Sequence, residues 1–212
     1  MKIISEQINP KSIKDILELS LTYYPKESPN ISEEYLYDLY LKNPLGPAMG
    51  CYCYEHPKLI GFMALIPVLL SAKNKPRLSY YCVNVLSHPQ HRNKNIFISL
   101  INVANEFLKK EQSILIGHPN KKAIPFWKRK RMSFQDDLIP GVILPKFFNK
   151  TKRLNLKNFE YIISNEFWSC IKENDSNLVK HTREFFKWRH FNRMKKHDVF
   201  AIYHNEKVVG LV

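Results

Sequence analysis

The segment between residues 78 and 108 constrains the fold of this 212-residue chain more than any other. Residues 78–86 are rich in aromatic and β-branched side chains, which favours a strand. Residues 87–95 are polar and basic. Over residues 96–108 the apolar side chains recur at the i, i+3, i+4, i+7 spacing of an amphipathic helix: Phe97, Leu100, Ile101, Ala104, Phe107 and Leu108. A strand that leads through a basic loop into a helix predicts an α/β domain.

Patterns on both sides of this segment predict further strands and helices. Ser32 is a suitable N-cap, and Glu33 and Glu34 follow it in the first turn, where the helix dipole favours acidic residues. The strand over residues 59–70 is expected to be interrupted at Pro67. The predicted order is β-α-α-β-β-β-α-β-α-β, with strands at 1–8, 50–55, 59–70, 78–86, 113–117 and 132–138, helices at 13–21, 33–42, 96–108 and 120–130, and a hairpin loop at 73–77.

Composition narrows the class of protein. Hydrophobic residues make up 44% of the chain and charged residues 25%, which predicts a packed core. No apolar run reaches the roughly 18 residues that a membrane span needs, and the first residues lack the apolar block of a signal peptide. We therefore predict a cytoplasmic protein. The four cysteines form no Cys-x-x-Cys pair, so we predict reduced thiols and no metal site.

The formal net charge of +14 favours acidic partners, such as phosphates, nucleotides, nucleic acid or an anionic membrane surface. The basic residues are dispersed, and no motif that reads DNA or RNA is present. Nucleic-acid binding is therefore kept only as an alternative.

The chain contains a candidate internal repeat. Residues 34–36 (Glu-Tyr-Leu) match 184–186 (Glu-Phe-Phe) at an offset of 150, and residues 58–61 match 207–210 at an offset of 149. A chance match of amphipathic patterns is the alternative. Duplication predicts three parts: a domain at 1–140, a basic linker at 141–157, and an incomplete second copy at 158–212. The last strand, 208–212, would leave an open edge, so we expect the second copy to be truncated or completed by another chain, and a homo-oligomer remains open.

The basic loop has the chemistry of a phosphate site. A helix N-terminus presents N–H groups and about half a positive charge, and a loop that leads into it can fold around a phosphate. Arg92 and Lys94 add side-chain charge. The sequence therefore predicts a pyrophosphate cradle, and a solvated basic turn is the alternative.

Residues 88–97 (His-Pro-Gln-His-Arg-Asn-Lys-Asn-Ile-Phe) resemble the acyl-CoA loop of the GNAT acetyltransferase superfamily, which reads Pro-x-Tyr-Arg-Gly-Lys-Gly-Ile. Residues 117–127 resemble the family's Asn-x-x-Ala-x-x-Phe-Tyr segment. Residues 34–36, 43–44 and 58–61 resemble a GNAT subgroup with a duplicated architecture, some of whose members occur with cell-surface polysaccharide biosynthesis. The resemblance implies a mixed, mostly antiparallel central sheet flanked by helices, followed by the start of a second GNAT-like copy.

The resemblance also implies a function. It predicts an N-acetyltransferase that uses acetyl-CoA as co-substrate and transfers the acetyl group to an amine or hydroxyl of a small acceptor, such as an amino sugar or a nucleotide sugar. The main chain of Leu86 and Ser87 would pair with the pantetheine. The residues expected to bind the cofactor are Leu86, Ser87, Arg92, Asn93, Lys94, Asn95, Ile96, Phe97 and Asn120.

Three departures from the family pattern leave the catalytic residues unassigned. Asn93 and Asn95 replace the loop glycines, Phe97 replaces a small residue seen in many members, and Trp127 stands where many members have a tyrosine proposed as general acid. The strand at 78–86 also carries no carboxylate where the family often has one. Tyr81 and His88 remain candidates for the base. A degenerate module that binds CoA without turnover is the second hypothesis, and a branch that uses long-chain acyl-CoA or aminoacyl-tRNA also stays open.

Overall fold

The computed structural model describes residues 1–72, 75–121, 123–129, 155–157, 179–180, 182–190, 201–204 and 207–211. The chain divides into two compact units. Unit 1 comprises Met1–Gly117 and Glu173–His197, and unit 2 comprises His118–Lys172 and Asp198–Val212. The predicted boundaries at residues 140 and 157 stay predictions, because residues 130–154 lie outside the described part of the chain.

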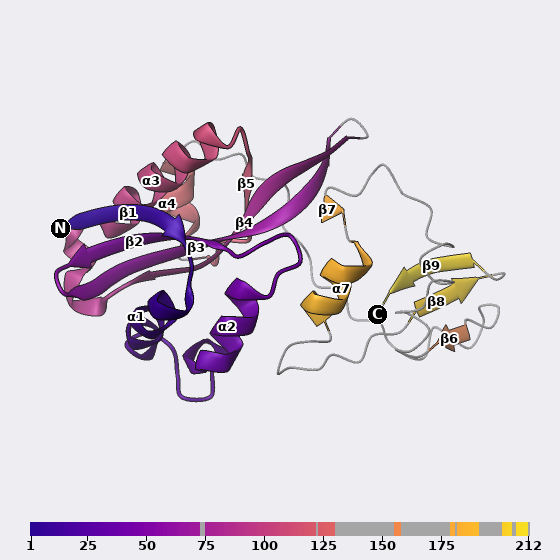
Figure 1. Ribbon diagram of the computed structural model, residues 1–212, viewed down its shortest axis with the longest axis horizontal. Helices are drawn as coiled ribbons and strands as arrows, with labels where there is room; N and C mark the ends of the chain where they lie inside the picture. The colour runs from indigo at the N-terminus through magenta and orange to yellow at the C-terminus, as the bar shows by residue number, and fades with distance from the viewer. Residues whose placement is uncertain are drawn as a thin grey trace. The chain divides into compact units, whose positions relative to one another are not determined.

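A mixed sheet forms the centre of unit 1 (Figure 1). Its strand order is β1-β2-β3-β4-β5, and a short strand, β7, pairs with the far end of β3. All of these pairings are antiparallel except that of β4 with β5. The predicted mostly antiparallel sheet is therefore confirmed. The bounds are β1 Lys2–Gln7, β2 Met49–Glu55, β3 Lys58–Ala72, β4 Lys75–Ser87, β5 Leu115–Ile116 and β7 Val179–Lys180.

Helices cover both faces of this sheet, α1 and α2 on one and α3 on the other (Figure 1). Local sequence explains where they begin. Asn9 and Ser12 form a reciprocal capping box at the start of α1, and the Ser32 side chain caps α2 as predicted. The bounds are α1 Pro10–Leu21, α2 Glu33–Leu41 and α3 Ile96–Lys110, with short 3₁₀ turns η1 at Pro29–Ile31 and η2 at Pro89–Lys94.

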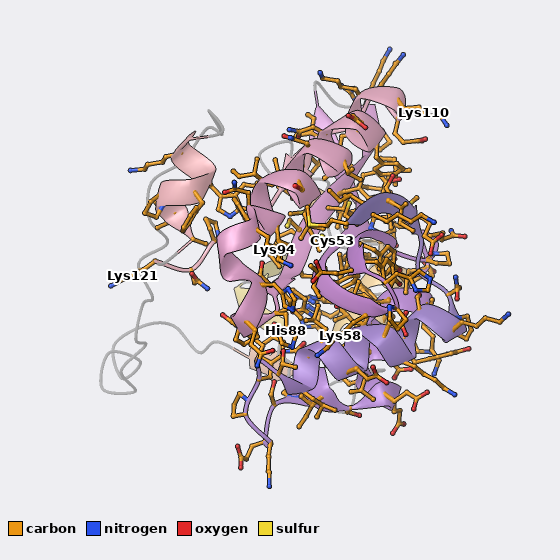
Figure 2. The ribbon with its side chains drawn as sticks, turned by 90° about the vertical axis from the view of Figure 1, so that its left-hand side faces the viewer. Cys53, Lys58, His88, Lys94, Lys110 and Lys121 are labelled. Atoms are coloured by element: carbon orange, nitrogen blue, oxygen red, sulfur yellow. The ribbon has the colours of Figure 1, made fainter. Side chains whose placement is uncertain are left out.

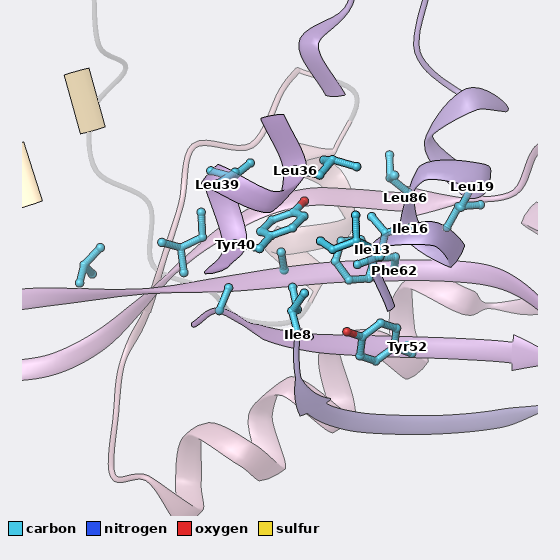
Figure 3. Packing of buried hydrophobic residues seen from close by; sticks show 14 of the residues in the cluster. Ile8, Ile13, Ile16, Leu19, Leu36, Leu39, Tyr40, Tyr52, Phe62 and Leu86 are labelled. Atoms are coloured by element: carbon cyan, nitrogen blue, oxygen red, sulfur yellow. The ribbon is translucent and has the colours of Figure 1, made fainter. Parts of the chain in front are cut away.

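The main core lies between the sheet and the α1/α2 layer (Figure 3). A helix from late in the chain, α7 (Arg183–His190), contributes to it. Trp188 of α7 is buried, and its Nε1 donates a 3.0 Å hydrogen bond to the carbonyl oxygen of Asp38 in α2. Burying each large apolar side chain contributes about 1.5–3 kcal/mol. Side chains buried here include Ile8, Ile13, Ile16, Leu36, Tyr40, Tyr52, Phe62 and Leu86.

Strand β3 runs through Pro67 without the predicted interruption. Pro67 faces Tyr80 of β4, and the Tyr80 N–H points away from β3 toward Ile114. The missing N–H of Pro67 would therefore point to the outer edge of β3, where neither β2 nor β7 pairs with it. The Pro67 carbonyl on that edge accepts a 2.9 Å hydrogen bond from Asn43 Nδ2, so the proline leaves the sheet intact.

Other boundaries also differ from the expectation. Strand β4 begins at Lys75, so the hairpin loop is shorter than the predicted 73–77. The predicted helix at 120–130 is α4, Ile124–Arg129, whose first turn accommodates Pro125 because the N–H of that position has no helical partner. The predicted strand at 132–138 lies outside the described residues.

A second, three-stranded sheet has the order β6-β8-β9, with β6 Asn155–Lys157, β8 Ala201–His204 and β9 Lys207–Leu211. The β8–β9 pairing skips Val209 between the pairs Tyr203–Val208 and Ile202–Gly210. The β2–β3 pairing skips Ile60 in the same way, between Tyr54–Leu59 and Cys53–Gly61. Each of the four residue pairs of β8 and β9 thus has a counterpart pair in β2 and β3, 149 positions earlier in the chain.

At Gly61 the sheet and the start of α3 approach each other closely. A Cβ at Gly61 would lie 2.2 Å from Ile96 Cγ2 and 3.1 Å from Cys53 Cβ. We predict that Gly61→Ala lowers the free energy of unfolding by about 1–3 kcal/mol, because Ile96 is buried and cannot move away freely. Urea titration measures this. Gly117→Ala is the control, since its nearest contact would be an ordinary 3.4 Å, and equal losses in the two variants would contradict the prediction.

Candidate functional site

The candidate site begins where β4 and β5 separate. Among the described residues, β4 pairs with β5 only at Tyr80–Leu115 and Tyr81–Ile116, whereas β4 itself continues to Ser87. Beyond Tyr81 the edge of β4 that faces away from β3 has no strand beside it in the described part of the chain. We call this stretch the open edge of β4. An open strand edge offers main-chain N–H and C=O groups to a ligand.

A one-residue bulge changes which main-chain groups reach the open edge. The β3–β4 ladder pairs Ala64 with Val83 and then Phe62 with Leu86, so two residues of β4, Asn84 and Val85, stand opposite one of β3. The His88 N–H donates a 2.8 Å hydrogen bond to the Ile60 carbonyl on the β3 side. Because alternate residues point to opposite edges, the N–H groups of Val85 and Ser87 face the open edge.

Leu86 and Ser87, both predicted to meet the cofactor through their main chains, therefore differ. Leu86 pairs with Phe62, its main chain faces β3, and its side chain is 1% exposed in the core. Ser87 is half-buried at the end of the strand and faces the open edge. The geometry supports the Ser87 prediction better than the Leu86 prediction.

The basic loop lies directly beyond the open edge. Residues Pro89–Lys94 form η2, and Asn95 then adopts a left-handed conformation, with φ 53° and ψ 28°. Asparagine tolerates this region better than most residues, which explains how it can replace a loop glycine here. Helix α3 begins at the next residue, Ile96, and the Asn95 side chain does not cap it. The positive end of the helix dipole is therefore presented at the loop.

His88 has a structural role in this loop. Its Nδ1 accepts a 3.3 Å hydrogen bond from the Gln90 N–H, so the side chain caps η2. Burial, with the nearby charges of Lys58 and His91, lowers the pKa of His88 below its ordinary value. His88 is therefore neutral at pH 7. Figure 2 shows His88, Lys58 and Lys94 gathered at one end of the domain, beside Cys53.

Lys94, predicted to bind phosphate, is held by an acidic partner. Its Nζ lies 2.6 and 2.8 Å from the two carboxylate oxygens of Glu55 at the end of β2. His91 Nδ1 lies 3.1 Å from Glu55 Oε2. The hydrogen bond from Lys94 lowers the pKa of Glu55, which keeps the carboxylate ionised at neutral pH. Glu55 thus places a negative charge beside the basic loop.

The remaining predicted cofactor residues fall into three groups. Ile96 is buried at the first position of α3, and Phe97 is partly buried. The backbone of Arg92 and Asn93 lies in η2, and their side chains lie outside the described part. Asn120 belongs to unit 2, where its Oδ1 accepts a 2.9 Å hydrogen bond from the Ala123 N–H just before α4. None of these placements tests binding, so all stay predictions.

Tyr81 and Cys82, two side chains of β4 with acidic protons, both keep those protons at neutral pH. Burial raises the pKa of Tyr81, an effect that Arg189 partly offsets, so its hydroxyl keeps its proton at neutral pH. Burial also raises the pKa of Cys82 to about 12, which agrees with a packed thiol rather than a nucleophile. Trp127, in unit 2, is 8% exposed and lies in a core position, whereas Phe126 is 46% exposed.

Within the part of the chain that the structure describes, no group of three or more His, Cys, Asp or Glu side chains is arranged to hold a metal ion. Within the same part, no helix combines the length and the apolar character needed to cross a bilayer.

A family model described as an acetyltransferase (GNAT) domain matches residues 6–130, which is more than half of the chain. The protein therefore belongs to the GNAT acetyltransferase domain family. The match contains the open edge of β4, the basic loop and α3. It does not test the subgroup with the duplicated architecture. No curated protein matches the chain.

Solved structures share the fold at low sequence identity. A probable N-acyltransferase from Enterococcus faecalis V583 matches with a TM-score of 0.64 and 13% identity, over 100% of this chain and 55% of its own. Saccharomyces cerevisiae N-myristoyltransferase with bound myristoyl-CoA matches with a TM-score of 0.56 and 17% identity, over 98% and 56%. A Trypanosoma brucei acetyltransferase matches with a TM-score of 0.51 and 15% identity, over 67% and 100%. This chain thus spans just over half the length of the first two.

Sequence reasoning missed Glu55 and the partners of Asn84. Glu55 comes before a turn that carries no motif, and 39 residues separate it from Lys94. Asn84 belongs to no motif in the sequence, yet its side chain joins residues from three other elements. The signal available was asparagine inside a strand, a residue type that strands disfavour and that bulges tolerate.

We predict that Glu55→Gln raises the affinity for CoA about two- to fivefold at low salt, because it releases Lys94 and removes a negative charge beside the loop. Isothermal titration with CoA measures this. Raising the salt concentration should shrink the gain, since exposed charges are screened. Glu106→Gln, an exposed site on α3, is the matched control. Weaker binding by the Glu55 variant would show that Glu55 supports the loop instead of opposing the ligand.

Proposed function

We propose that this protein transfers an acyl group, most simply acetyl, from acyl-CoA to a small acceptor. One observation carries the proposal: a single continuous segment, residues 80–97, supplies an open strand edge, a basic loop and the uncapped start of a helix. The first can pair with pantetheine, and the other two can hold a pyrophosphate. Membership of the GNAT family supports this use of the segment.

In the proposed reaction, an amine or hydroxyl of the acceptor attacks the thioester carbonyl, loses its proton, and the CoA thiolate leaves. N–H groups on the open edge of β4 would bind the developing oxyanion. Neither candidate base is assigned. The neutral His88 imidazole already uses its Nδ1 lone pair to accept from the Gln90 N–H, and the Tyr81 hydroxyl stays protonated at pH 7.

The acceptor is proposed to be an amino sugar or a nucleotide sugar. This rests on the sequence resemblance to a subgroup that occurs with polysaccharide biosynthesis. Cytoplasmic location remains part of the same proposal. The match to a structure with bound myristoyl-CoA keeps longer acyl chains as an alternative donor.

Isothermal titration of the full chain with acetyl-CoA tests the donor site. We predict binding with a dissociation constant below about 1 mM, the upper end of the usual range for enzyme substrates. Replacing both Arg92 and Lys94 with alanine should weaken it about tenfold or more, because two charged phosphate contacts are removed. The double variant Lys11→Ala/Lys14→Ala, on exposed positions of α1, removes the same charge elsewhere and should bind normally.

The outcomes separate the competing functions. No binding of acetyl-CoA would remove the acyltransferase proposal. Binding without turnover on a panel of amines, amino sugars and nucleotide sugars would favour the degenerate CoA-binding module. Tight, salt-dependent binding to a random duplex would instead favour the nucleic-acid alternative.

We also propose that residues 158–212, together with β6, begin a second copy of the unit formed by β1, α2, β2 and β3. Support comes from the common hairpin irregularity at an offset of 149 and from a common helix start. Thr182 Oγ1 accepts from the Phe185 N–H as Ser32 Oγ accepts from the Tyr35 N–H, 150 positions earlier. The given sequence holds one basic loop of this kind, so one CoA should bind per chain.

Disulfide trapping tests the register of the second sheet. In a Cys170→Ser background, the pair Leu156→Cys and Ile202→Cys should form a disulfide on oxidation, because these residues face each other across β6 and β8. Leu156→Cys with Tyr203→Cys is the control, since neighbouring residues on a strand point to opposite faces. Faster bonding in the control would contradict the proposed register.

A further inference from the structure

Asn84 is the residue of the β4 bulge that has an unusual backbone conformation. Its φ is 50°, in the left-handed region, inside a strand whose other described residues are extended. The bulge has a structural consequence on both faces of the sheet. Before it, the Tyr80 ring packs edge-on against Phe107 of α3, with centroids 5.1 Å apart. After it, Leu86 points to the opposite face, into the α1/α2 core (Figure 3). Without the extra residue, Tyr80 and Leu86 would share one face.

The Asn84 amide is fully engaged by side chains from the α1/α2 layer. Its Nδ2 donates to the Tyr40 hydroxyl oxygen at 2.7 Å and to Asn30 Oδ1 at 3.1 Å. Its Oδ1 accepts from the Tyr24 hydroxyl at 3.1 Å. Three elements therefore converge on one bulge residue: the turn after α1, the 3₁₀ turn η1, and α2. We call Tyr24, Asn30, Tyr40 and Asn84 the bulge network.

The bulge network is uncharged. Tyr40 is 0% exposed, and burial raises its pKa far above the ordinary value. Burial raises the pKa of Tyr24 to about 12. Both hydroxyls thus keep their protons throughout the neutral range. Only Tyr40 is fully buried and the three hydrogen bonds are part-buried, so breaking the network costs most at Tyr40, where a partner left unpaired carries its own desolvation cost.

We propose that Asn84 is a positioning residue for acyl transfer: the bulge network fixes the β4 main chain at residues 84–85, so that an N–H on the open edge is already oriented toward the acyl carbonyl when the donor binds. This inference rests on the proposed function. Fixed dipoles stabilise developing charge better than mobile ones, since no reorientation is needed as the charge forms. Asn84 would not hold its left-handed conformation without these partners, because a left-handed residue inside a strand is strained and persists only when its surroundings support it.

In this arrangement, different parts of the site recognise the acyl group and the CoA group. The basic loop would bind the nucleotide part of either CoA or acetyl-CoA, whereas the bulge would contact only the acyl group. The test therefore compares the affinities of the full chain for CoA and acetyl-CoA by isothermal titration. It also records the ¹³C shift of the carbonyl in bound [1-¹³C]acetyl-CoA, which reports hydrogen bonding to that oxygen.

Two variants test the network, one that weakens it and one that removes it. Tyr40→Phe deletes one hydroxyl, and Asn84→Gly keeps the left-handed backbone accessible while deleting all three hydrogen bonds. Each should reduce the preference for acetyl-CoA over CoA about two- to tenfold, the value of one lost neutral hydrogen bond. CoA affinity should change less than twofold, and the carbonyl shift should move toward its value in water. Tyr24→Phe, at a half-buried site, is the alternative if Tyr40→Phe does not fold.

Tyr23→Phe is the matched control, because Tyr23 is 47% exposed, adjoins Tyr24 and lies outside the bulge network. If folded network variants keep the wild-type preference and carbonyl shift, the positioning role is overturned while the CoA site stands. The same holds if the wild type binds CoA and acetyl-CoA equally with no carbonyl shift. Failure of the wild type to bind either ligand overturns the proposed function and the positioning role together.

Discussion

The pairing of β3 with β4, and the single extra residue that β4 carries in it, is the constraint on which the domain depends. It lets Tyr80 contact α3 on one face while Leu86 enters the α1/α2 core on the other. It also directs main-chain groups of β4 to the edge left open by the short β5. Core packing and the candidate acyl site thus have a common origin, so a change that straightened β4 would damage both.

Electrostatics at the other end of the site are more balanced than the net charge of +14 suggests. Glu55 engages Lys94 and lies close to His91, and His88 is held neutral by burial and by neighbouring positive charge. The Asn95 side chain does not cap α3, so among the described residues no N-cap side chain offsets the dipole at its start. An anion arriving at this loop would therefore compete with a carboxylate already in place, which limits binding of simple anions and rewards a ligand with several contacts.

One hairpin in each of the two sheets has the same irregular pairing. Tyr54 pairs with Leu59 and Tyr203 with Val208, each beside an extra residue in the second strand of the hairpin. The helices that precede these hairpins, α2 and α7, both start from a hydroxyl cap. Yet α7 packs in unit 1, where Trp188 contacts α2 and completes the first core. If the repeat is a duplication, its helix has become part of the neighbouring domain.

Sequence alone determined features that depend on local interactions: the helix periodicity of 96–108, the Ser32 cap, the order of helices and strands along the chain as far as α4, and the basic loop. It also placed asparagine where the chain needs left-handed backbone, at Asn95. Only tertiary structure decided that Pro67 sits on an unpaired edge, that Glu55 holds Lys94, and that Tyr24 and Tyr40 lock Asn84. Those partners lie tens of residues apart, and the pairings of nonlocal groups follow from strand register and packing, which no local pattern encodes.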